Sequence, residues 1–433
     1  MQTEPSSGKT ALRGSLILTA ARVGTMVLGF GINVLLARML PIESLGAYFL
    51  LTSFVQVAAL IALGGFNQGA VPLLSGSERV WPVLRGSGLF LVLTISITCG
   101  VAALLVPLTL QFDRALSGLA TIVIIWVVAR AMTQAVAHSV RAFGRMTDFG
   151  LHEVFSFNLL LFIACAVVFS LGQNLDLMMI VWITSIAALL CVPLSMIGLF
   201  PALKSLPKTA GIDFVPIIKT SLPLAMIAVA NTALSEAHLW IAGALGDTET
   251  VALFGAALRV VRLLALPLMA VNLAIGPQIA RQWKANETAP LERLLRLSAT
   301  VIMAVSLTVM GGLLVLGPAV LGLIFGDAFT AAWPVFVILL FGQMVNAATG
   351  SPMLLMSVTN AQRAAMVIAL SASILGVGVS FILGGIDPLC GVAIGASTTV
   401  ITQNLLSVWY CVTRMGIKTY PTLRLGKKQF LWP

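Results

Sequence analysis

The chain has 433 residues, of which 9% are charged and 59% are hydrophobic. Soluble domains carry about one quarter charged residues, so this composition excludes a soluble globular protein and indicates an integral membrane protein. The net charge of +10 reflects membrane orientation, because the basic residues gather in alternate connections; no nucleic-acid partner is expected. The cysteines are scattered through apolar segments without pairing or metal-ligand spacing, which predicts small buried residues and neither disulfides nor a metal site.

Apolar runs along the chain predict about twelve membrane-spanning helices, and hence an all-α polytopic membrane protein. Each run is near the ~20 residues that cross a bilayer, or is longer and so tilted or broken. Prolines inside the runs, at Pro223, Pro267 and Pro352, predict kinks. The predicted spans are Ser15–Leu40, Leu45–Leu63, Gly86–Pro107, Leu116–Ala137, Leu151–Leu171, Leu177–Phe200, Val215–Leu245, Val251–Pro277, Leu297–Phe325, Trp333–Met356, Ala364–Leu383 and Leu389–Val412.

The connections between these spans alternate in charge. Of the 25 lysines and arginines, Arg38 and Arg114 lie in one set of alternate connections, and Arg22, Arg130, Arg259 and Arg262 lie inside spans. All the others lie in the other set of connections. Basic loops stay on the cytoplasmic side of a membrane. The pattern therefore predicts an even number of spans with both termini in the cytoplasm.

The chain is expected to consist of two six-helix lobes. A cytoplasmic N-terminal segment, 1–14, precedes an N-lobe, 15–200; a linker, 201–214, leads to a C-lobe, 215–413, and a basic cytoplasmic tail, 414–433. Residues 41–48 match 247–254 at an offset of 206, and Asn67 and Pro72 recur as Asn272 and Pro277 at an offset of 205. These offsets are close to half the chain length, which favours a duplicated half.

Three ionisable residues are expected near the membrane midplane. Counted from the short acidic turn at 246–250, Glu236 lies about 13 Å deep and Arg259 and Arg262 roughly 12 to 17 Å deep at helical rise, while half a bilayer core is about 15 Å. Charge at that depth indicates a functional site, although a structural ion pair explains one arginine. Arg262 is expected in a cavity, Arg259 fits either role, and His238 points elsewhere than Glu236.

Two further arginines lie inside spans of the first half. Arg130, Gln134, His138 and Arg141 form one helical stripe, and such a stripe must face protein or water in a membrane. Arg130 is about 12 Å from the inner end, which favours a cavity wall, whereas His138 and Arg141 can snorkel to the headgroups. For Arg22, snorkelling and cavity lining are equally good interpretations.

Polar amides on the tenth span, Gln343 and Asn346, can donate hydrogen bonds to a hydroxyl-rich substrate or to a neighbouring helix. No metalloprotease, paired CxxC, serine-hydrolase or complete phosphate-loop motif occurs in the sequence. The sequence therefore predicts no catalytic residue, no metal, no cofactor and no enzyme activity.

Five segments of the chain, residues 35–48, 239–246, 254–259, 277–280 and 326–329, carry a resemblance to a known family. They resemble segments of polysaccharide-export (Wzx-like) flippases of the multidrug/oligosaccharidyl-lipid/polysaccharide superfamily. Residues 35–48 resemble the end of that family's first helix, and residues 239–246 and 254–259 resemble the start of its second lobe. The resemblance implies a MATE/MurJ-like fold, with two six-helix lobes around a cavity that opens alternately to either side.

It also implies a cargo of polyprenyl-pyrophosphate-linked oligosaccharide, flipped across the bacterial inner membrane for exopolysaccharide or O-antigen export. The expected partners are this lipid-linked oligosaccharide, membrane lipids and other polysaccharide assembly proteins. The expected substrate-binding residues are Arg22, Arg130, Arg259, Arg262, Gln343 and Asn346, with Glu236 as the candidate for ion coupling. The alternatives are a cation-coupled multidrug exporter of the same superfamily, a membrane enzyme of polysaccharide assembly, and a scaffold that does not transport.

Overall fold

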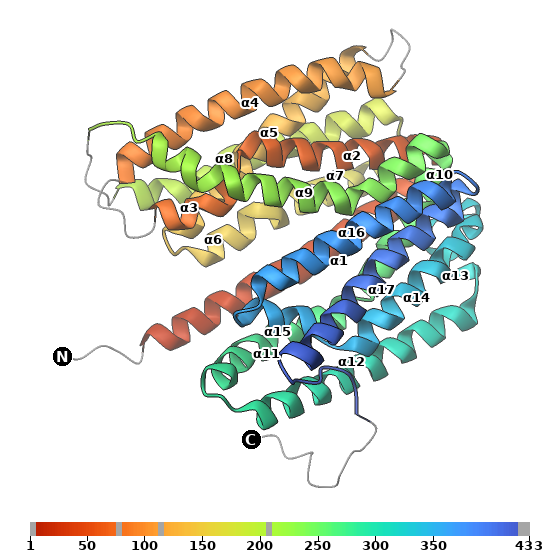
Figure 1. Cartoon of the computed structure of the whole chain (residues 1–433). Coiled ribbons are helices and arrows are strands. Elements are labelled where there is room, and N and C mark those ends of the chain that lie inside the picture. Colours follow the sequence, from red (N-terminus) through yellow and green to blue (C-terminus); the bar gives the residue numbers. More distant parts are fainter. Residues whose placement is uncertain (1–5, 75–79, 111–116, 205–209, 423–433) are drawn as a thin grey trace, which may run out of the picture. The chain divides into compact units, whose positions relative to one another are not determined.

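The computed structural model describes residues 6–74, 80–110, 117–204 and 210–422, and this part of the chain contains helices and no strand (Figure 1). The chain divides into two compact units, Met1–Ala233 and Leu234–Pro433. Residues 1–5 of the predicted N-terminal segment, 205–209 of the predicted linker and 423–433 of the predicted tail lie outside the described residues.

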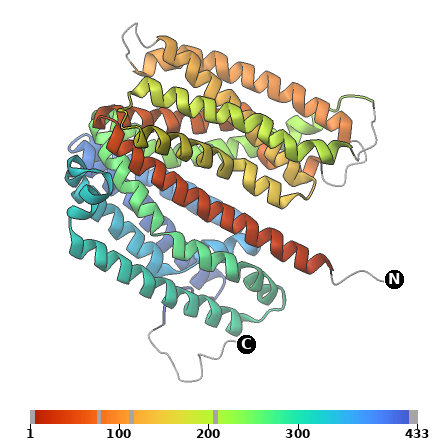
Figure 2. The same ribbon diagram turned by 180° about the vertical axis from the view of Figure 1, so that it is seen from behind.

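The first unit contains nine helical elements and the first part of a tenth. They are α1 (Ser6–Met39), α2 (Ile42–Leu63), α3 (Phe66–Leu74), α4 (Val80–Leu110), α5 (Ser117–Ala142), α6 (Met146–Gly150), the π-helix η2 (Leu151–Phe155), α7 (Ser156–Ser170), α8 (Leu177–Lys204) and the beginning of α9 (Val215–Leu245). Figure 2 shows α1 from behind as one long helix. Because α1 starts at Ser6, most of the predicted polar segment 1–14 is helical.

The second unit contains the rest of α9 and nine further elements. They are α10 (Thr248–Leu263), α11 (Leu266–Lys284), α12 (Thr288–Leu316), α13 (Ala319–Phe325), the 3-10 helix η3 (Asp327–Ala332), α14 (Trp333–Thr349), α15 (Pro352–Val358), α16 (Gln362–Gly384) and α17 (Pro388–Arg414). The boundary between the units falls inside α9, whereas the predicted linker 201–214 precedes this helix. The lobe boundaries stay a prediction.

Within the described residues, ten helices are long and apolar enough to cross a membrane, or eleven if a bent pair counts as one span. The predicted fifth span, Leu151–Leu171, corresponds to η2 followed by α7, and α6, η2 and α7 continue without a break from Met146 to Ser170. At ~1.5 Å per helical residue, this stretch is long enough for the ~30 Å core of a bilayer, although α7 alone, with 15 residues, is not counted among the ten. The prediction of an all-helical polytopic membrane protein is confirmed, with a lower count of clear spans.

Three of the predicted spans are broken into two helices. α10 and α11 are bent by 40°, and Pro267 occupies the first turn of α11. Gly317 and Gly350, with φ of 63° and 73°, end α12 and α14. Both glycines have a positive φ, which glycine adopts at little steric cost, and this conformation ends the helix. The predicted kinks at Pro267 and Pro352 are thus helix starts, while Pro223 lies inside the continuous α9.

The proposed repeat has a counterpart in the helices. α2 follows Pro41 and is succeeded, after Gly64 and Gly65, by the short helix α3. α10 begins after Asp247 and is succeeded by α11 in the same way. The break after α10 comes earlier relative to the matched residues, because α2 has 22 residues and α10 has 16. Each half thus contains a broken helix after the matched residues, but the breaks do not fall at matching positions.

Glycines explain why the first part of α9 belongs to the first unit. A Cβ on Gly65, whose φ is 80°, would lie 2.7 Å from the backbone nitrogen of Ala225, and one on Gly69 would meet the side chain of Ser221. Such distances are shorter than van der Waals contact. Small residues of this kind allow helices to approach closely in a membrane, where there is no hydrophobic driving force between them.

The hairpin of α16 and α17, which lie side by side, is the most closely packed pair in the second unit (Figure 1). A Cβ on Gly395 would lie 2.5 Å from the carbonyl oxygen of Gly376, and one on Gly391 would lie 2.5 Å from the nitrogen of Gly384. Asp387 begins α17 by accepting hydrogen bonds of 3.0 Å from two backbone N–H groups. The turn and the glycines together fix the register of the hairpin.

Residues 415–422, which we call the C-terminal strap, follow α17 and fold back on the second unit. Ile417 and Thr419 are 1% and 0% exposed. The Thr419 hydroxyl donates to the carbonyl oxygen of Thr349 at 3.1 Å, and a side chain at Gly350 would meet the strap backbone. The first part of the predicted tail is therefore packed against the helices.

Candidate functional site

Two charged side chains meet where α9 and α10 form a hairpin in the second unit. The Arg262 Nη2 atom lies 4.0 Å from the Glu236 Oε1 atom, and the side chains are 53% and 11% exposed. Glu236 is nine residues before the end of α9, which is about 13 Å along the helix. Arg262 is fourteen residues into α10, about 21 Å along it, and its long side chain reaches back toward the carboxylate.

The local sequence fixes this hairpin. Asp247 begins α10 by accepting hydrogen bonds from the backbone N–H and the hydroxyl of Thr250, at 2.7 and 2.8 Å. The backbone hydrogen bond is the main reason that the pKa of Asp247 is lowered, and the hydroxyl adds to it. A carboxylate at this position satisfies N–H groups that have no partner within the helix.

The sequence left open which arginine pairs with Glu236, and the structure selects Arg262. Arg259 is half-buried, and its Nη1 atom donates to the carbonyl oxygen of Gly255 one turn earlier, at 2.9 Å. A single contact of 4.0 Å with Glu236 uses one amino group of a guanidinium that carries five N–H donors. Because Arg262 is also half-exposed, it is suited to bind an anion.

His238 lies on a different face of α9 from Glu236, as the sequence predicted. Its Nδ1 atom lies 2.8 Å from the hydroxyl of Ser380 on α16, and its Nε2 atom lies 3.3 Å from the hydroxyl of Thr399 on α17. Ser380 also donates to the carbonyl oxygen of Val392 at 3.2 Å, so it accepts from the Nδ1–H group of histidine. The ring is 7% exposed and joins three helices through hydrogen bonds.

The two arginines predicted in the first half are in the first unit, apart in the chain from Arg259 and Arg262. The guanidinium carbon of Arg130 lies 4.5 Å from the ring centroid of Phe157 on α7, a cation–π distance. Arg22 is exposed on α1. The convergence of the four arginines on one cavity stays a prediction.

Gln343 and Asn346, predicted to bind substrate, contact each other on α14. The Asn346 amide donates to the Gln343 carbonyl oxygen at 3.1 Å, and both side chains are half-buried. This contact aligns the two amides along one face of the helix. A role of this pair in substrate binding stays a prediction.

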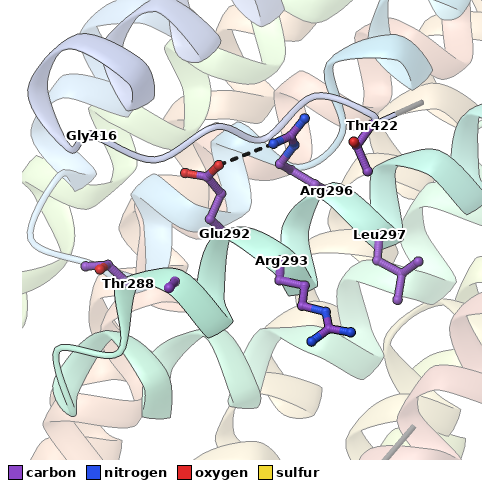
Figure 3. Close-up of a pocket in the computed structure, with 8 residues that line it drawn as sticks. Thr288, Glu292, Arg293, Arg296, Leu297, Gly416 and Thr422 are labelled. Carbon is purple, nitrogen blue, oxygen red and sulfur yellow. Dashed lines mark hydrogen bonds and ion pairs between the residues drawn. The ribbon is translucent and has the colours of Figure 1, made fainter. Parts of the chain in front are cut away.

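Two surface features were not found from the sequence. An apolar groove of about 600 Å³ lies between α9 and α16, lined by Ala237, Trp240, Ile241, Val377 and Phe381 among others. A polar groove of about 410 Å³ lies between the start of α12 and the C-terminal strap (Figure 3). Finding either groove requires knowing which segments that are distant in the sequence lie side by side in the fold. In the part of the chain that the structure describes, no group of three His, Cys, Asp or Glu residues is suited to hold a metal ion.

No protein-family model matches the sequence, and no curated protein matches it significantly. Among solved structures, the chain is similar to the lipid II flippase MurJ in an inward closed conformation, with a TM-score of 0.71 and 13% identity over 92% of this chain and 88% of that one. It is also similar to an inward-facing multidrug resistance MATE family transporter of the MOP superfamily, with a TM-score of 0.64 and 16% identity over 93% of this chain and 98% of that one.

A third similar structure is a MOP superfamily transporter from Pyrococcus furiosus, described as having a binding pocket of reverse polarity. Its TM-score is 0.60, with 16% identity over 94% of this chain and 95% of that one. All three similarities extend over nearly the whole chain at low identity. The chain therefore has the fold of the MATE and MurJ transporters.

Proposed function

We propose that this protein is a transporter that flips polyprenyl-pyrophosphate-linked oligosaccharide across the bacterial inner membrane, by alternating access of two lobes. The observation that carries the proposal is the half-exposed guanidinium of Arg262 beside the nearly buried carboxylate of Glu236, deep along a membrane hairpin. A guanidinium can form paired hydrogen bonds with phosphate oxygens. The similarity to MurJ, described as a lipid II flippase, supports the same class of cargo.

In this proposal Arg22, Arg130 and Arg259 contribute further positive charge to the cavity, and Gln343 and Asn346 contact sugar hydroxyls. Glu236 couples transport to an ion, because protonation of its carboxylate would weaken its attraction for Arg262 and leave the guanidinium to the pyrophosphate. The apolar groove between α9 and α16 suits the isoprenoid chain of the same substrate. The alternation of basic connections favours both termini in the cytoplasm, and in this proposal the protein works as a transporter rather than an enzyme.

The second candidate is a cation-coupled multidrug exporter, which the similarity to MATE transporters favours. A cavity for cationic drugs needs exposed acidic groups. Glu236 is the only acidic residue deep inside a predicted span, and it is paired with Arg262 and 11% exposed. Excess positive charge at this depth would repel such substrates, which favours the flippase.

The test uses cells that lack the protein. Lipid-linked oligosaccharides would be extracted, and the membrane face they occupy would be measured with an impermeant probe. The flippase predicts that complete repeat units accumulate on the cytoplasmic face and that the wild-type protein relieves the accumulation. Normal lipid intermediates with altered sensitivity to cationic drugs would support the exporter, and an incomplete or unpolymerised glycan on the outer face would support an enzyme.

A matched set of variants tests the site. Arg262→Gln should fail to relieve the accumulation, whereas Arg363→Gln, at an exposed arginine in the first turn of α16, should behave as wild type. Arg262→Gln leaves Glu236 without its partner, so the double variant Glu236→Gln/Arg262→Gln provides the control for an unpaired buried charge. If the double variant restores flipping, Arg262 only neutralises Glu236, and its role in substrate binding is wrong.

A further inference from the structure

A cluster of ionisable side chains lies in the first unit, where α5 turns into α6. The Arg145 Nε atom lies 2.6 Å from the Asp148 Oδ2 atom, and the two side chains are 37% and 25% exposed. The Arg145 Nη1 atom also donates to the carbonyl oxygen of Gly198 on α8, at 2.8 Å. Arg145 thus ties the start of α6 to α8 through one ion pair and one hydrogen bond. The cluster is separate from the residues predicted to bind substrate.

A histidine packs into the same place. His152 lies in the π-helix η2, which follows α6 without a break. A Cβ placed on Gly198 would lie 3.3 Å from the Asp148 Cβ atom and 3.6 Å from the His152 Cδ2 atom. Both side chains therefore rest against the same point of α8. Because Gly198 has no side chain there, α6 and η2 can approach α8 closely.

The π-helical turn decides which way the histidine faces. A π-helix has one more residue per turn than an α-helix is able to hold, and such turns are frequent at functional sites. The Ser156 hydroxyl donates to the carbonyl oxygen of Leu151 within this turn, at 2.6 Å. On the side toward α1, a Cβ on Gly24 would lie 3.0 Å from the ring of Phe155. η2 is thus held between α1 and α8, and His152 lies on the side that faces α8.

The closed arrangement fits only the neutral form of the histidine ring. In the part of the first unit that the structure describes, the His152 Nδ1 atom is buried and has no hydrogen-bond partner. As the acceptor nitrogen of a neutral ring it is tolerated, whereas an N–H group of a charged ring would be buried there without an acceptor, which is strongly unfavourable. The carboxylate of Asp148 acts on the ring, but it is already paired with Arg145.

The described ionisable side chains at this end of the neighbouring helices are directed elsewhere. They are Arg22 of α1, Arg130, His138 and Arg141 of α5, and Lys204 of α8. The three on α5 contact the rings of Phe149 and Phe157, at centroid distances of 4.5 to 5.2 Å, and the other two are exposed. The charges that act on the His152 ring are those of Asp148 and Arg145.

We propose that Arg145, Asp148 and His152 form a pH-sensitive clasp, which holds α6 and η2 against α8 while His152 is neutral and opens when the ring takes up a proton. Two routes give the new N–H group an acceptor, and both open the clasp. Either the Asp148 carboxylate turns from Arg145 to the ring, or the ring leaves α8 for water. Histidine changes charge between about pH 5 and 8. The predicted orientation of the basic connections puts the clasp on the cytoplasmic side, and its action does not depend on which substrate the protein transports.

Hydrogen–deuterium exchange of the full-length protein in detergent tests the clasp, since opening exposes the backbone N–H groups of residues 145–156. Exchange would be measured at about pH 8 and about pH 5.5, on either side of the ordinary pKa of histidine, and corrected for the pH dependence of exchange in an unfolded peptide. In the wild type, protection of this segment should fall roughly tenfold in acid, the change that a tenfold difference in proton affinity between the open and the closed clasp produces. The melting temperature at the higher pH shows whether each variant folds.

Four variants assign the response. His152→Gln has a polar side chain that does not titrate, and should keep its protection at both pH values. Asp148→Asn removes the ion pair with Arg145, and should have low protection at both. His138→Gln and Glu153→Gln change ionisable residues of α5 and η2, and should respond to pH as the wild type does.

Equal pH responses of the wild type and His152→Gln would overturn the proposal. A response that is lost in His138→Gln or Glu153→Gln and kept in His152→Gln would overturn it too, because another group would then carry the charge change. Asp148→Asn gives an independent decision, since a fall in protection as large as that of the wild type would show that the ion pair is not part of the clasp.

Discussion

Replacing Gly391 by alanine tests the close packing of α16 against α17. The new Cβ would fall inside van der Waals contact of the Leu383 carbonyl group and 2.5 Å from the backbone nitrogen of Gly384. Because these are backbone atoms, they cannot rotate away, and overpacking costs about 1–3 kcal/mol, here at the upper end. Alanine recovers up to about 1 kcal/mol of helix propensity. The expected net loss of unfolding free energy is therefore about 2 kcal/mol.

Gly378 provides the matched control, because it lies in α16 and a Cβ there meets nothing within 4 Å. Gly378→Ala should gain up to about 1 kcal/mol from helix propensity. The two variants would be purified in detergent, and their thermal unfolding followed by intrinsic tryptophan fluorescence. Gly391→Ala should melt below wild type and Gly378→Ala at or above it. Equal melting temperatures for the two variants would refute the packing of the hairpin.

Two other predictions concern the hairpin of α9 and α10. Asp247→Ala should lower the free energy of unfolding by about 1 kcal/mol at neutral pH, because it removes the cap of α10. Hydrogen bonds from Thr250 lower the pKa of Asp247, so the wild-type cap contributes fully above pH ~4 and is lost as the pH falls through the lowered pKa. Unfolding measured as a function of pH should therefore separate the two proteins only above that range. His238→Leu should destabilise the protein by about 1–3 kcal/mol, because it leaves the buried Ser380 hydroxyl with one partner fewer. Adding Ser380→Ala to His238→Leu should recover part of this loss, and a double variant no more stable than the single one would contradict the hydrogen-bonded link.

The candidate site was predictable in part, because depth along a helix follows from counting residues. The sequence located Glu236 and Arg262 on facing helices of one hairpin and predicted that His238 faces elsewhere. It left the partner of Glu236 open, because Arg259 and Arg262 are three residues apart and share a face. Only the tertiary structure shows that Arg259 donates to its own helix at Gly255 and that Arg262 approaches the carboxylate.

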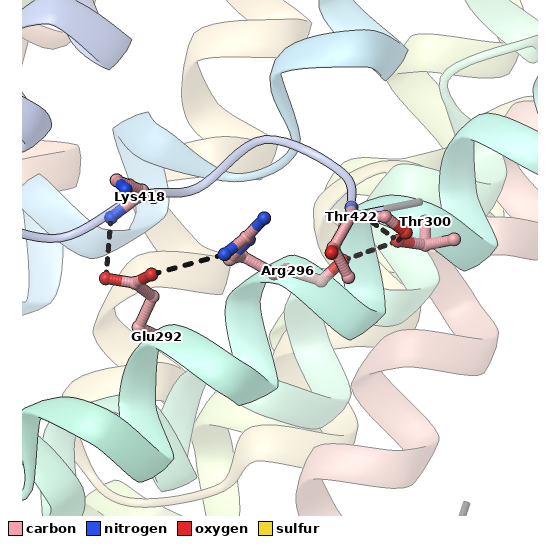
Figure 4. A network of polar contacts seen from close by, with 5 residues as sticks. All are labelled: Glu292, Arg296, Thr300, Lys418 and Thr422. Atoms are coloured by element: carbon pink, nitrogen blue, oxygen red, sulfur yellow. Dashed lines mark hydrogen bonds and ion pairs between the residues drawn. The ribbon is translucent and has the colours of Figure 1, made fainter. Parts of the chain in front are cut away.

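The sequence by itself determined that this protein is helical and crosses a membrane, because hydrophobic length and loop charge are local properties of the chain. It did not determine the break between α10 and α11 or the π-helical turn η2 before α7, since a helix can bend or widen where neighbouring helices supply the packing. The partners of His238, the polar groove and the C-terminal strap (Figure 4) join segments 70 or more residues apart. Such contacts depend on which helix faces join and in what register, and only the tertiary structure decides that.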